Sequence, residues 1–324
     1  MASTRDIQRR IKSVRNTKKI TRAMEMVSAA KMRKAVEAVL RTRTYANLSW
    51  ETVLNLSRAL NNADGTNLHP LLTKREEIKK VGIILITSNR GLCGGFNTAI
   101  INKVHESIKK HHKAGREYSI GAEFILIGKK GSAIYRHGHE IVAEFEKLDL
   151  ATEVSEVVPI AKYIINDYLS GRYDRIMVAY TDFVSPVKQM PRVKQILPVD
   201  INAHADHYLG VVGQDTRVGT TRGFIKEKEE KHLKTEKFEY EYTFEPNPRE
   251  VLDEMIPRLV EVQLYQALLE SNASEQSARM AAMHQATEAA GSMIDELTLF
   301  YNKARQASIT AEIAEISAGA DALK

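Results

Sequence analysis

The two ends of the chain constrain its fold most, because each is a long stretch with few helix-breaking residues. Residues 4–60 contain no Gly and no Pro, and they are dominated by Ala, Lys, Arg, Met and Glu, which favour helices. Residues 248–324 are similarly regular, with Pro257 early enough to mark a first turn or a kink. A helix of this second length measures on the order of 100 Å, which exceeds the width of a domain of this size. We therefore expect a long helix at each end of the chain.

Apolar and small residues recur in both segments at alternating spacings of three and four, which is the heptad pattern of a coiled coil. In the first segment Ile7, Ile11 and Val14 follow this pattern, and Lys18 and Thr21 continue it. In the second segment the recurring positions hold many small or flexible side chains. They are Met280, Met283, Thr287, Ala290, Ile294, Leu297, Tyr301, Ala304, Ser308 and Ala311. Helices this long and this poor in apolar residues are not stable alone. We expect the two to pair antiparallel along these positions.

Charge divides unevenly between the two segments. Residues 1–43 hold thirteen Lys and Arg against three Asp and Glu, whereas residues 249–324 hold twelve Asp and Glu against six Lys and Arg. Segments of opposite sign attract each other, and a basic helix can also face an acidic partner. The chain has no run of eighteen apolar residues, so we expect no transmembrane helix.

The middle of the chain changes character, because short β-rich runs alternate there with helical stretches. Helices are predicted near residues 98–113 and 155–170. The predicted strands are Val81–Thr87, Glu123–Ile127, Arg175–Tyr180 and, as an edge strand ended by Pro198, Val193–Val199. This alternation indicates a small, mostly parallel sheet covered by helices.

These patterns divide the chain into four parts. We expect a coiled-coil helix at 1–62, an α/β domain at 75–200, an insert at 201–245 and a second coiled-coil helix at 246–324. The insert is punctuated by Gly and charged residues, and we expect a hairpin or an extended loop there. The predicted fold class is therefore α/β, with a long antiparallel coiled coil beside a small α/β domain.

No catalytic, cofactor-binding or metal-binding site stands out. The loop Ser88–Asn97 (SNRGLCGGFN) follows the first predicted strand, but it matches neither GxxxxGK[ST] nor GxGxxG, so a tight packed turn is favoured over a phosphate loop. Cys93 lacks the setting of a nucleophile and is expected to be a small buried residue. Several histidines lack the spacing of metal ligands and are expected on the surface, namely His111, His112, His137, His139, His204 and His207. We expect a protein that is not an enzyme.

The residues alone leave more than one function open. A basic coiled-coil protein that binds nucleic acid or tethers other molecules would explain the charge and the helices. No aromatic residue precedes Tyr45, however, and a basic helix facing an acidic protein surface is favoured over nucleic acid. A nucleotide-dependent enzyme would explain the α/β domain, but it would need a phosphate loop that the sequence lacks.

Four stretches resemble the γ-subunit family of F-type ATP synthases. They are Asp6–Lys34 (DIQRRIKSVRNTKKITRAMEMVSAAKMRK), Thr87–Asn97 with RGLCGGFN, Ala273–Met283 (ASEQSARMAAM) and Tyr301–Glu312 (YNKARQASITAE). The resemblance spans the chain except for residues 201–240. It implies a rotor, in which two terminal helices form an antiparallel coiled coil inside a hexamer of α and β subunits. A Rossmann-like domain would lie beside the ε subunit and the membrane c-ring.

The resemblance also implies a mechanism, a location and a set of contact residues. Ion flow would turn the c-ring and this shaft, and the shaft would drive the catalytic β subunits, with no cofactor or nucleic acid on this chain. The protein would be peripheral, at the cytoplasmic face of a bacterial cell membrane, and held there only through the complex. Met24 would meet the β levers, Glu245 would face ε and the c-ring, and Arg305, Gln306 and Thr310 would touch the catch loops of the hexamer.

The chain departs from the short bacterial pattern of this family at residues 201–240, where it is longer. We expect either a β-hairpin that damps ATP hydrolysis or a passive surface loop, and the sequence does not choose between them. Because Cys93 is the single cysteine, a thiol switch inside the insert is excluded.

Overall fold

The structure, a computed structural model, describes residues 4–63, 69–73, 75, 77–113, 121–147, 153–199, 245 and 248–321. The chain divides into two compact units. The helical unit comprises Met1–Ala30 and Arg279–Lys324, and the α/β unit comprises Lys31–Ala278. Within the described residues, no helix is both long enough and apolar enough to cross a membrane.

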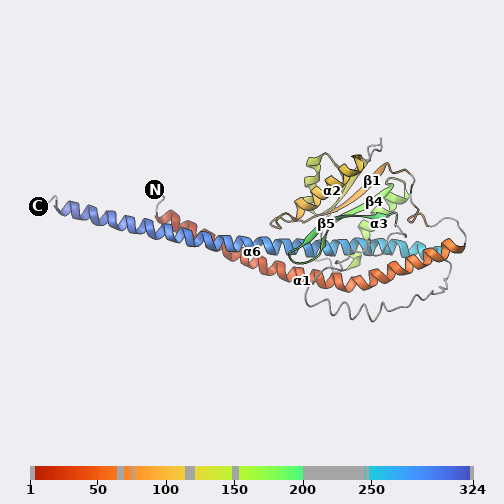
Figure 1. Cartoon of the computed structure of the whole chain (residues 1–324), viewed down its shortest axis with the longest axis horizontal. Helices are drawn as coiled ribbons and strands as arrows, with labels where there is room; N and C mark the ends of the chain where they lie inside the picture. Colours follow the sequence, from red (N-terminus) through yellow and green to blue (C-terminus); the bar gives the residue numbers. More distant parts are fainter. Residues whose placement is uncertain are drawn as a thin grey trace. The chain divides into compact units, whose positions relative to one another are not determined.

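Two long helices run through both units. Helix α1 spans Thr4–Ala63 and helix α6 spans Pro248–Asp321, which confirms both predicted terminal helices (Figure 1). Pro257 lies inside α6 and outside its first turn. In the helical unit the two helices run antiparallel, because Thr21 of α1 meets Thr287 of α6 and Glu25 meets the earlier residue His284.

A five-stranded sheet forms the centre of the α/β unit. Its strands lie in the order β3-β2-β1-β4-β5, and all neighbours are parallel except β4 and β5. The strands are β1 (Lys80–Ile86), β2 (Gly121–Ile127), β3 (Glu140–Phe145), β4 (Arg175–Phe183) and β5 (Gln189–Leu197). The mostly parallel sheet is confirmed, and so is the last strand as an edge strand. An edge position lets β5 include Pro191, whose nitrogen has no hydrogen to donate to a neighbour.

Helices cover both faces of the sheet, which is why its central strands are continuous apolar runs. On one face Leu85 and Leu126 pack with Ile100 and Val104 of helix α2 (Phe96–Lys113), and the 3-10 helix η1 (Lys129–His137) joins this cluster. The other face packs against α3 (Val158–Leu169), which follows the short 3-10 helix η2 (Val154–Glu156), and against α6. Apolar side chains of α6 therefore form part of the hydrophobic core on this face of the sheet.

The predicted insert at 201–245 lies outside the described residues, apart from Glu245. The predicted boundaries of the four parts remain predictions. Strand β3 and helix η1 were not predicted from the sequence. Strand β3 has no fully buried residue and lacks a continuous apolar run. Helix η1 follows Gly128 and contains Gly131, and glycine disfavours helices.

Candidate interaction surfaces

In the helical unit several of the buried side chains lie at predicted heptad positions. Ile11 and Thr21 of α1 are buried, as are Met283 and Ala290 of α6. The predicted positions of α6 continue half-buried up to Ala304. Periodic packing of two helices therefore accounts for the buried side chains of this unit.

Polar groups also cross between these helices. The Thr287 hydroxyl donates to the Thr21 hydroxyl at 2.7 Å, and His284 Nδ1 lies 3.2 Å from a Glu25 carboxylate oxygen. Lys18 crosses over Gly291, where an added Cβ would lie only 3.0 Å from the Lys18 ammonium nitrogen. The contact explains how a lysine occupies a position in the predicted heptad, because glycine leaves room for it.

The end of α6 is exposed. The helix register places Thr4, the first residue of α1, level with about residue 304, since both lie seventeen residues from the Thr21–Thr287 contact. Every described side chain of α6 from residue 305 to residue 318 is exposed. The predicted seam positions Ser308 and Ala311 are therefore uncovered, because no residue of α1 from Thr4 onward reaches them.

Three of the predicted contact residues lie on this exposed end. Arg305, Gln306 and Thr310 are all exposed, and the Thr310 hydroxyl donates to the Gln306 carbonyl oxygen at 2.9 Å. Large apolar side chains accompany them, with Ile313 62% and Ile316 73% exposed. Apolar groups left in water at the end of a helix suit a surface that a partner covers.

The other two predicted contact residues lie elsewhere. Met24 is half-buried on α1 and is next to Glu25, which contacts His284 of α6. Along α6, His284 is about twenty residues, or roughly 30 Å, from Arg305. Glu245 is exposed in the α/β unit, just before α6 begins. The structure thus groups Arg305, Gln306 and Thr310 and separates Met24 from them.

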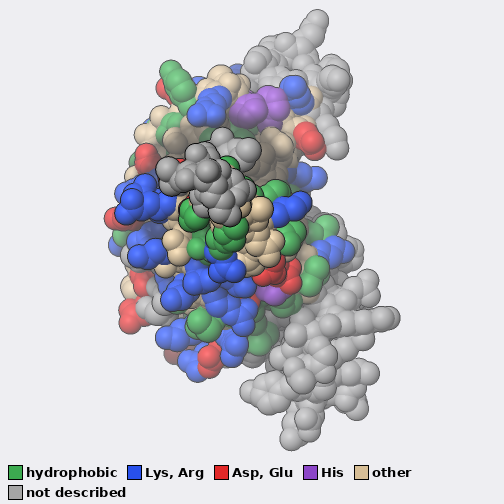
Figure 2. Space-filling view, turned by 90° about the vertical axis from the view of Figure 1, so that its left-hand side faces the viewer, with side chains coloured by type: hydrophobic (Ala, Val, Ile, Leu, Met, Phe, Trp, Pro, Cys, Tyr) green, Lys and Arg blue, Asp and Glu red, His purple; other side chains and the backbone are tan. Residues whose placement is uncertain are grey.

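The first turns of α1 present a basic surface. Its Lys and Arg side chains are exposed, and they are Arg5, Arg9, Arg10, Lys12, Arg15, Lys18, Lys19 and Arg22. Two of them form ion pairs within the helix, Arg9 with Asp6 at 3.8 Å and Arg22 with Glu25 at 3.0 Å. Figure 2 looks onto the end marked N and C in Figure 1 and shows Lys and Arg side chains gathered on that face. Such a surface attracts acidic partners over several ångströms.

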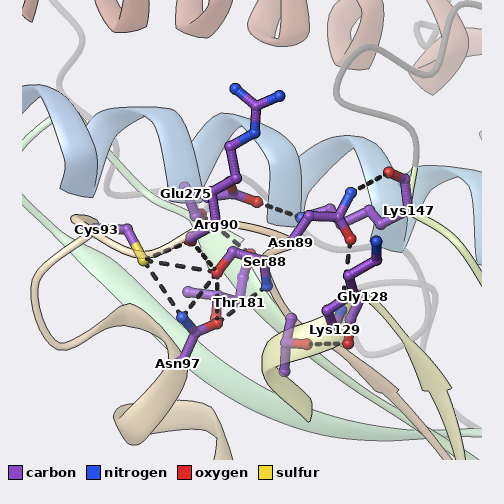
Figure 3. A network of polar contacts seen from close by, with 12 residues as sticks. Ser88, Asn89, Arg90, Cys93, Asn97, Gly128, Lys129, Lys147, Thr181 and Glu275 are labelled. Atoms are coloured by element: carbon purple, nitrogen blue, oxygen red, sulfur yellow. Dashed lines mark hydrogen bonds and ion pairs between the residues drawn. The ribbon is translucent and has the colours of Figure 1, made fainter. Parts of the chain in front are cut away.

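The loop between β1 and α2 is closed by its own side chains (Figure 3). The Asn97 side chain accepts a hydrogen bond from the Ser88 backbone N–H at 3.0 Å and donates to the Ser88 hydroxyl at 2.8 Å. Cys93 is buried beside them, with its sulfur 3.3 Å from the Asn97 amide nitrogen. The loop has the geometry of the predicted tight turn, and Cys93 is the predicted small buried residue.

One buried ion pair ties this region to α6. Lys147 Nζ lies 2.6 Å from a Glu275 carboxylate oxygen, and the two side chains are only 1% and 5% exposed. The Asn89 amide of the loop donates to the Lys147 carbonyl oxygen at 2.5 Å. Figure 3 shows Asn89 between the loop and this pair. The pair therefore connects the β1–α2 loop, the end of β3 and the long helix.

A second polar cluster lies where the sheet meets α6. The Asp182 carboxylate, fully buried on β4, is 2.7 Å from Arg192 Nε on β5. Lys194 of β5 and Tyr180 of β4 line a cavity of about 20 Å³ together with Gln266 and Glu270 of α6, enough room for one water molecule. Burial lowers the pKa of Lys194, although Glu270 and Asp182 partly oppose this effect. The sheet and α6 thus meet through charged groups as well as apolar ones.

A further carboxylate anchors the start of β1. Asp174 accepts backbone N–H groups of Lys79 and Lys80 at 2.8 and 2.9 Å, and it forms an ion pair with Arg75 at 2.9 Å. Burial raises the pKa of Asp174, but these hydrogen bonds and the Arg75 charge outweigh burial and lower it below its ordinary value. The carboxylate is therefore bound in its charged form.

Sequence reasoning missed both buried polar clusters. Lys147 and Glu275 are 128 residues apart, and no local pattern marks either of them. The one available signal was the run of polar residues in α6 between residues 270 and 277, which is too polar for an ordinary core helix. Every residue from 259 to 277 is nevertheless buried.

A family model described as ATP synthase matches residues 3–323. The ATP synthase gamma chain of Herpetosiphon aurantiacus is 41% identical over 329 residues, which cover 100% of this chain and 99% of that one. The ATP synthase gamma chain of Nitrosomonas europaea is 37% identical over 324 residues, which cover 100% of both chains. These matches extend the predicted resemblance to the full length of the chain.

Solved structures show the same fold. A chain of the Euglena gracilis mitochondrial ATP synthase, in a structure of its OSCP, F1 and c-ring, matches with a TM-score of 0.60 at 18% identity, covering 99% of this chain and 94% of that chain. A chain of the central stalk and c-ring of the Tetrahymena thermophila mitochondrial ATP synthase matches with a TM-score of 0.56 at 21% identity, covering 82% and 99%. The alternative of a nucleic-acid-binding or tethering protein finds no support in these comparisons. The chain belongs to the family of ATP synthase gamma chains.

Proposed function

We propose that this chain is the rotor in the central stalk of an F-type ATP synthase, where it couples ion-driven rotation of the c-ring to conformational change at the catalytic β subunits. Membership of the gamma-chain family supports the proposal. The observation that carries it is the continuity of α6, which is buried on all sides at residues 259–277 and exposed at residues 305–318. A single unbroken helix passes torque from one region to the other through its hydrogen-bonded backbone.

The exposed surfaces suggest where the partners bind. The end of α6, with Arg305, Gln306 and Thr310, would contact the α and β subunits, and Met24 would meet the β levers. The basic start of α1 would face acidic loops of β through contacts that act over about 8 Å at physiological salt and do not lock in one position. The α/β unit, with Glu245, would face the ε subunit and the c-ring.

The chain itself would be non-catalytic and without a cofactor. The tight hydrogen bonding of the β1–α2 loop supports this, because Ser88 and Asn97 hydrogen-bond each other within the loop. The protein would be peripheral, at the cytoplasmic face of a bacterial cell membrane, and would reach the membrane only through the complex.

Reconstitution with purified α and β subunits tests the proposal. We expect a stable complex whose ATP hydrolysis depends on this chain, and no hydrolysis by the chain alone. A variant with Arg9→Gln, Arg10→Gln and Arg15→Gln should assemble more weakly and with less dependence on salt. A control with Lys103→Gln, on the exposed surface of α2, should assemble like the unaltered chain. Hydrolysis by the isolated chain, or no complex, would contradict the proposal.

A further inference from the structure

Three histidine rings from separate elements meet at one edge of the α/β unit. His105 lies on α2, His137 ends η1, and His139 precedes β3. The ring centroid of His105 is 4.7 Å from that of His137 and 5.7 Å from that of His139. Gly138, between the latter two, has a φ of 78°, a conformation that glycine adopts without strain. This turn brings His137 and His139, which are two residues apart, against the ring of His105.

The nitrogen atoms of two of these rings face each other. His105 Nδ1 lies 3.4 Å from His139 Nε2. At this separation one ring can donate a hydrogen bond to the other, in a direction that depends on the tautomer. Two imidazole nitrogens that bind one tetrahedral ion at about 2.0–2.1 Å are themselves about 3.4 Å apart. The two rings are thus spaced as ligands of a single ion would be.

We propose that His105 and His139 bind a divalent transition-metal ion of the zinc type. Imidazole is a preferred ligand of Zn²⁺, Cu²⁺ and Ni²⁺. Among the described residues no set of three or more His, Cys, Asp and Glu side chains is placed to hold one ion, so this site has two protein ligands. Both rings are half-buried, and water completes the coordination. His137, whose ring is tilted by 39° against that of His105, positions the His105 ring and is not itself a ligand.

The ion would join a helix that packs on the sheet to an edge strand of the same sheet. His105 comes from the helix that covers one face, and His139 immediately precedes edge strand β3. A ligand that binds only the folded state stabilises that state in proportion to its concentration relative to Kd. The proposed ion therefore stabilises the α/β unit. This inference does not depend on the rotor function.

Metal titration of the full chain, purified without a histidine tag, tests the site. Co²⁺ reports tetrahedral coordination by its visible spectrum, and Zn²⁺ displaces it if both ions share the site. We expect His105→Asn and His139→Asn each to weaken Zn²⁺ binding by more than about 100-fold, since loss of an outer-shell partner of a ligand already weakens binding by about 10–100-fold. His284→Asn, which removes an exposed histidine of the helical unit, should leave binding unchanged. His137→Asn should weaken it by a smaller factor.

A thermal measurement separates the site from unspecific binding. Zn²⁺ should raise the midpoint of thermal unfolding of the unaltered chain and of the His284→Asn variant, but not of the His105→Asn variant. Circular dichroism should show that all variants keep their helix content. The proposal is overturned if the unaltered chain does not bind Zn²⁺, or if both His105→Asn and His139→Asn bind it as tightly as the unaltered chain does.

Discussion

Helix α6 passes through two different surroundings, and the contrast between them separates stability from function. In the α/β unit every residue from 259 to 277 is buried, polar ones included. In the helical unit only the positions that face α1 are covered, and none is covered from residue 305 to residue 318. Backbone structure is the same in both places. The surroundings therefore decide whether a side chain holds the fold together or remains available to a partner.

The contrast extends to charge. In the α/β unit α6 carries a buried charged pair, Glu275 with Lys147. In the helical unit the basic residues at the start of α1 are exposed. Removing one member of a buried pair leaves the other charge uncompensated, whereas water and salt screen an exposed charge. Substitutions should therefore have large effects in one unit and small effects in the other.

The largest effect is expected for Glu275→Gln in the α/β unit. The substitution leaves the Lys147 ammonium buried without a counter-charge and should lower the free energy of unfolding by about 3–5 kcal/mol. Urea unfolding followed by circular dichroism measures it. The matched control is Glu288→Gln, at a side chain 70% exposed on the same helix, which should stay within about 0.5 kcal/mol. Equal losses for the two variants would remove the contrast between the units.

A smaller loss is expected for Asp174→Asn, which weakens the anchor at the start of β1. Hydrogen bonds to a charged group contribute about 1.5–3 kcal/mol, and the amide keeps part of them. Because the pKa of Asp174 is lowered in the folded protein, its contribution is present above the unfolded pKa of about 3.9 and is lost as the pH falls through the folded value.

The pH dependence gives this prediction its check. The difference in the free energy of unfolding between the unaltered chain and Asp174→Asn should be constant from pH 7 to pH 5 and should shrink below about pH 4. Urea unfolding at a series of pH values measures the difference. A difference that grows on acidification would mean that the carboxylate is not held in its charged form.

In the helical unit we expect Thr287→Val to cost about 1 kcal/mol, because it removes one partner of the Thr21–Thr287 hydrogen bond. The double variant Thr21→Val, Thr287→Val should recover most of this loss, since valine fills the same space and no hydroxyl is left unpaired. Thermal unfolding of both variants measures the coupling. An additive loss in the double variant would show that the hydroxyls do not act as a pair.

The smallest effect is expected at the exposed end of α6. Ile313→Ser and Ile316→Ser should each change the free energy of unfolding of the isolated chain by less than about 0.5 kcal/mol. Leu268→Ala on the same helix, at a buried position of the α/β unit, should cost about 2–5 kcal/mol. If the exposed end serves the proposed function, the isoleucine variants should instead weaken assembly with α and β subunits.

The sequence predicted the elements that repeat a pattern over many residues. Both long helices and four of the five strands carry a clear period or a continuous apolar run, so they could be recognised locally. Strand β3 could not, because Glu140–Phe145 mixes charged and apolar residues at a sheet edge. The order of the strands was also beyond reach, since it depends on packing between distant segments.

The features of the candidate surfaces also divide into those that the sequence could predict and those that it could not. The basic start of α1 could be predicted, because charge is a local property, whereas the exposed Ile313 and Ile316 near the end of α6 were not predicted. The Lys147–Glu275 pair and the meeting of His105 with His139 could not, because each joins residues that only the folded chain brings together. The heptad pattern also continued to Ser308 and Ala311, although the structure covers neither residue.

The most direct test of the rotor proposal is to watch this chain turn. Lys103→Cys places a reactive thiol on the exposed surface of α2, while the natural Cys93 is buried. With the hexamer of α and β subunits fixed to a surface and a bead attached at residue 103, ATP should drive stepwise rotation in one direction. A complex that hydrolyses ATP while the bead stays still would contradict the account.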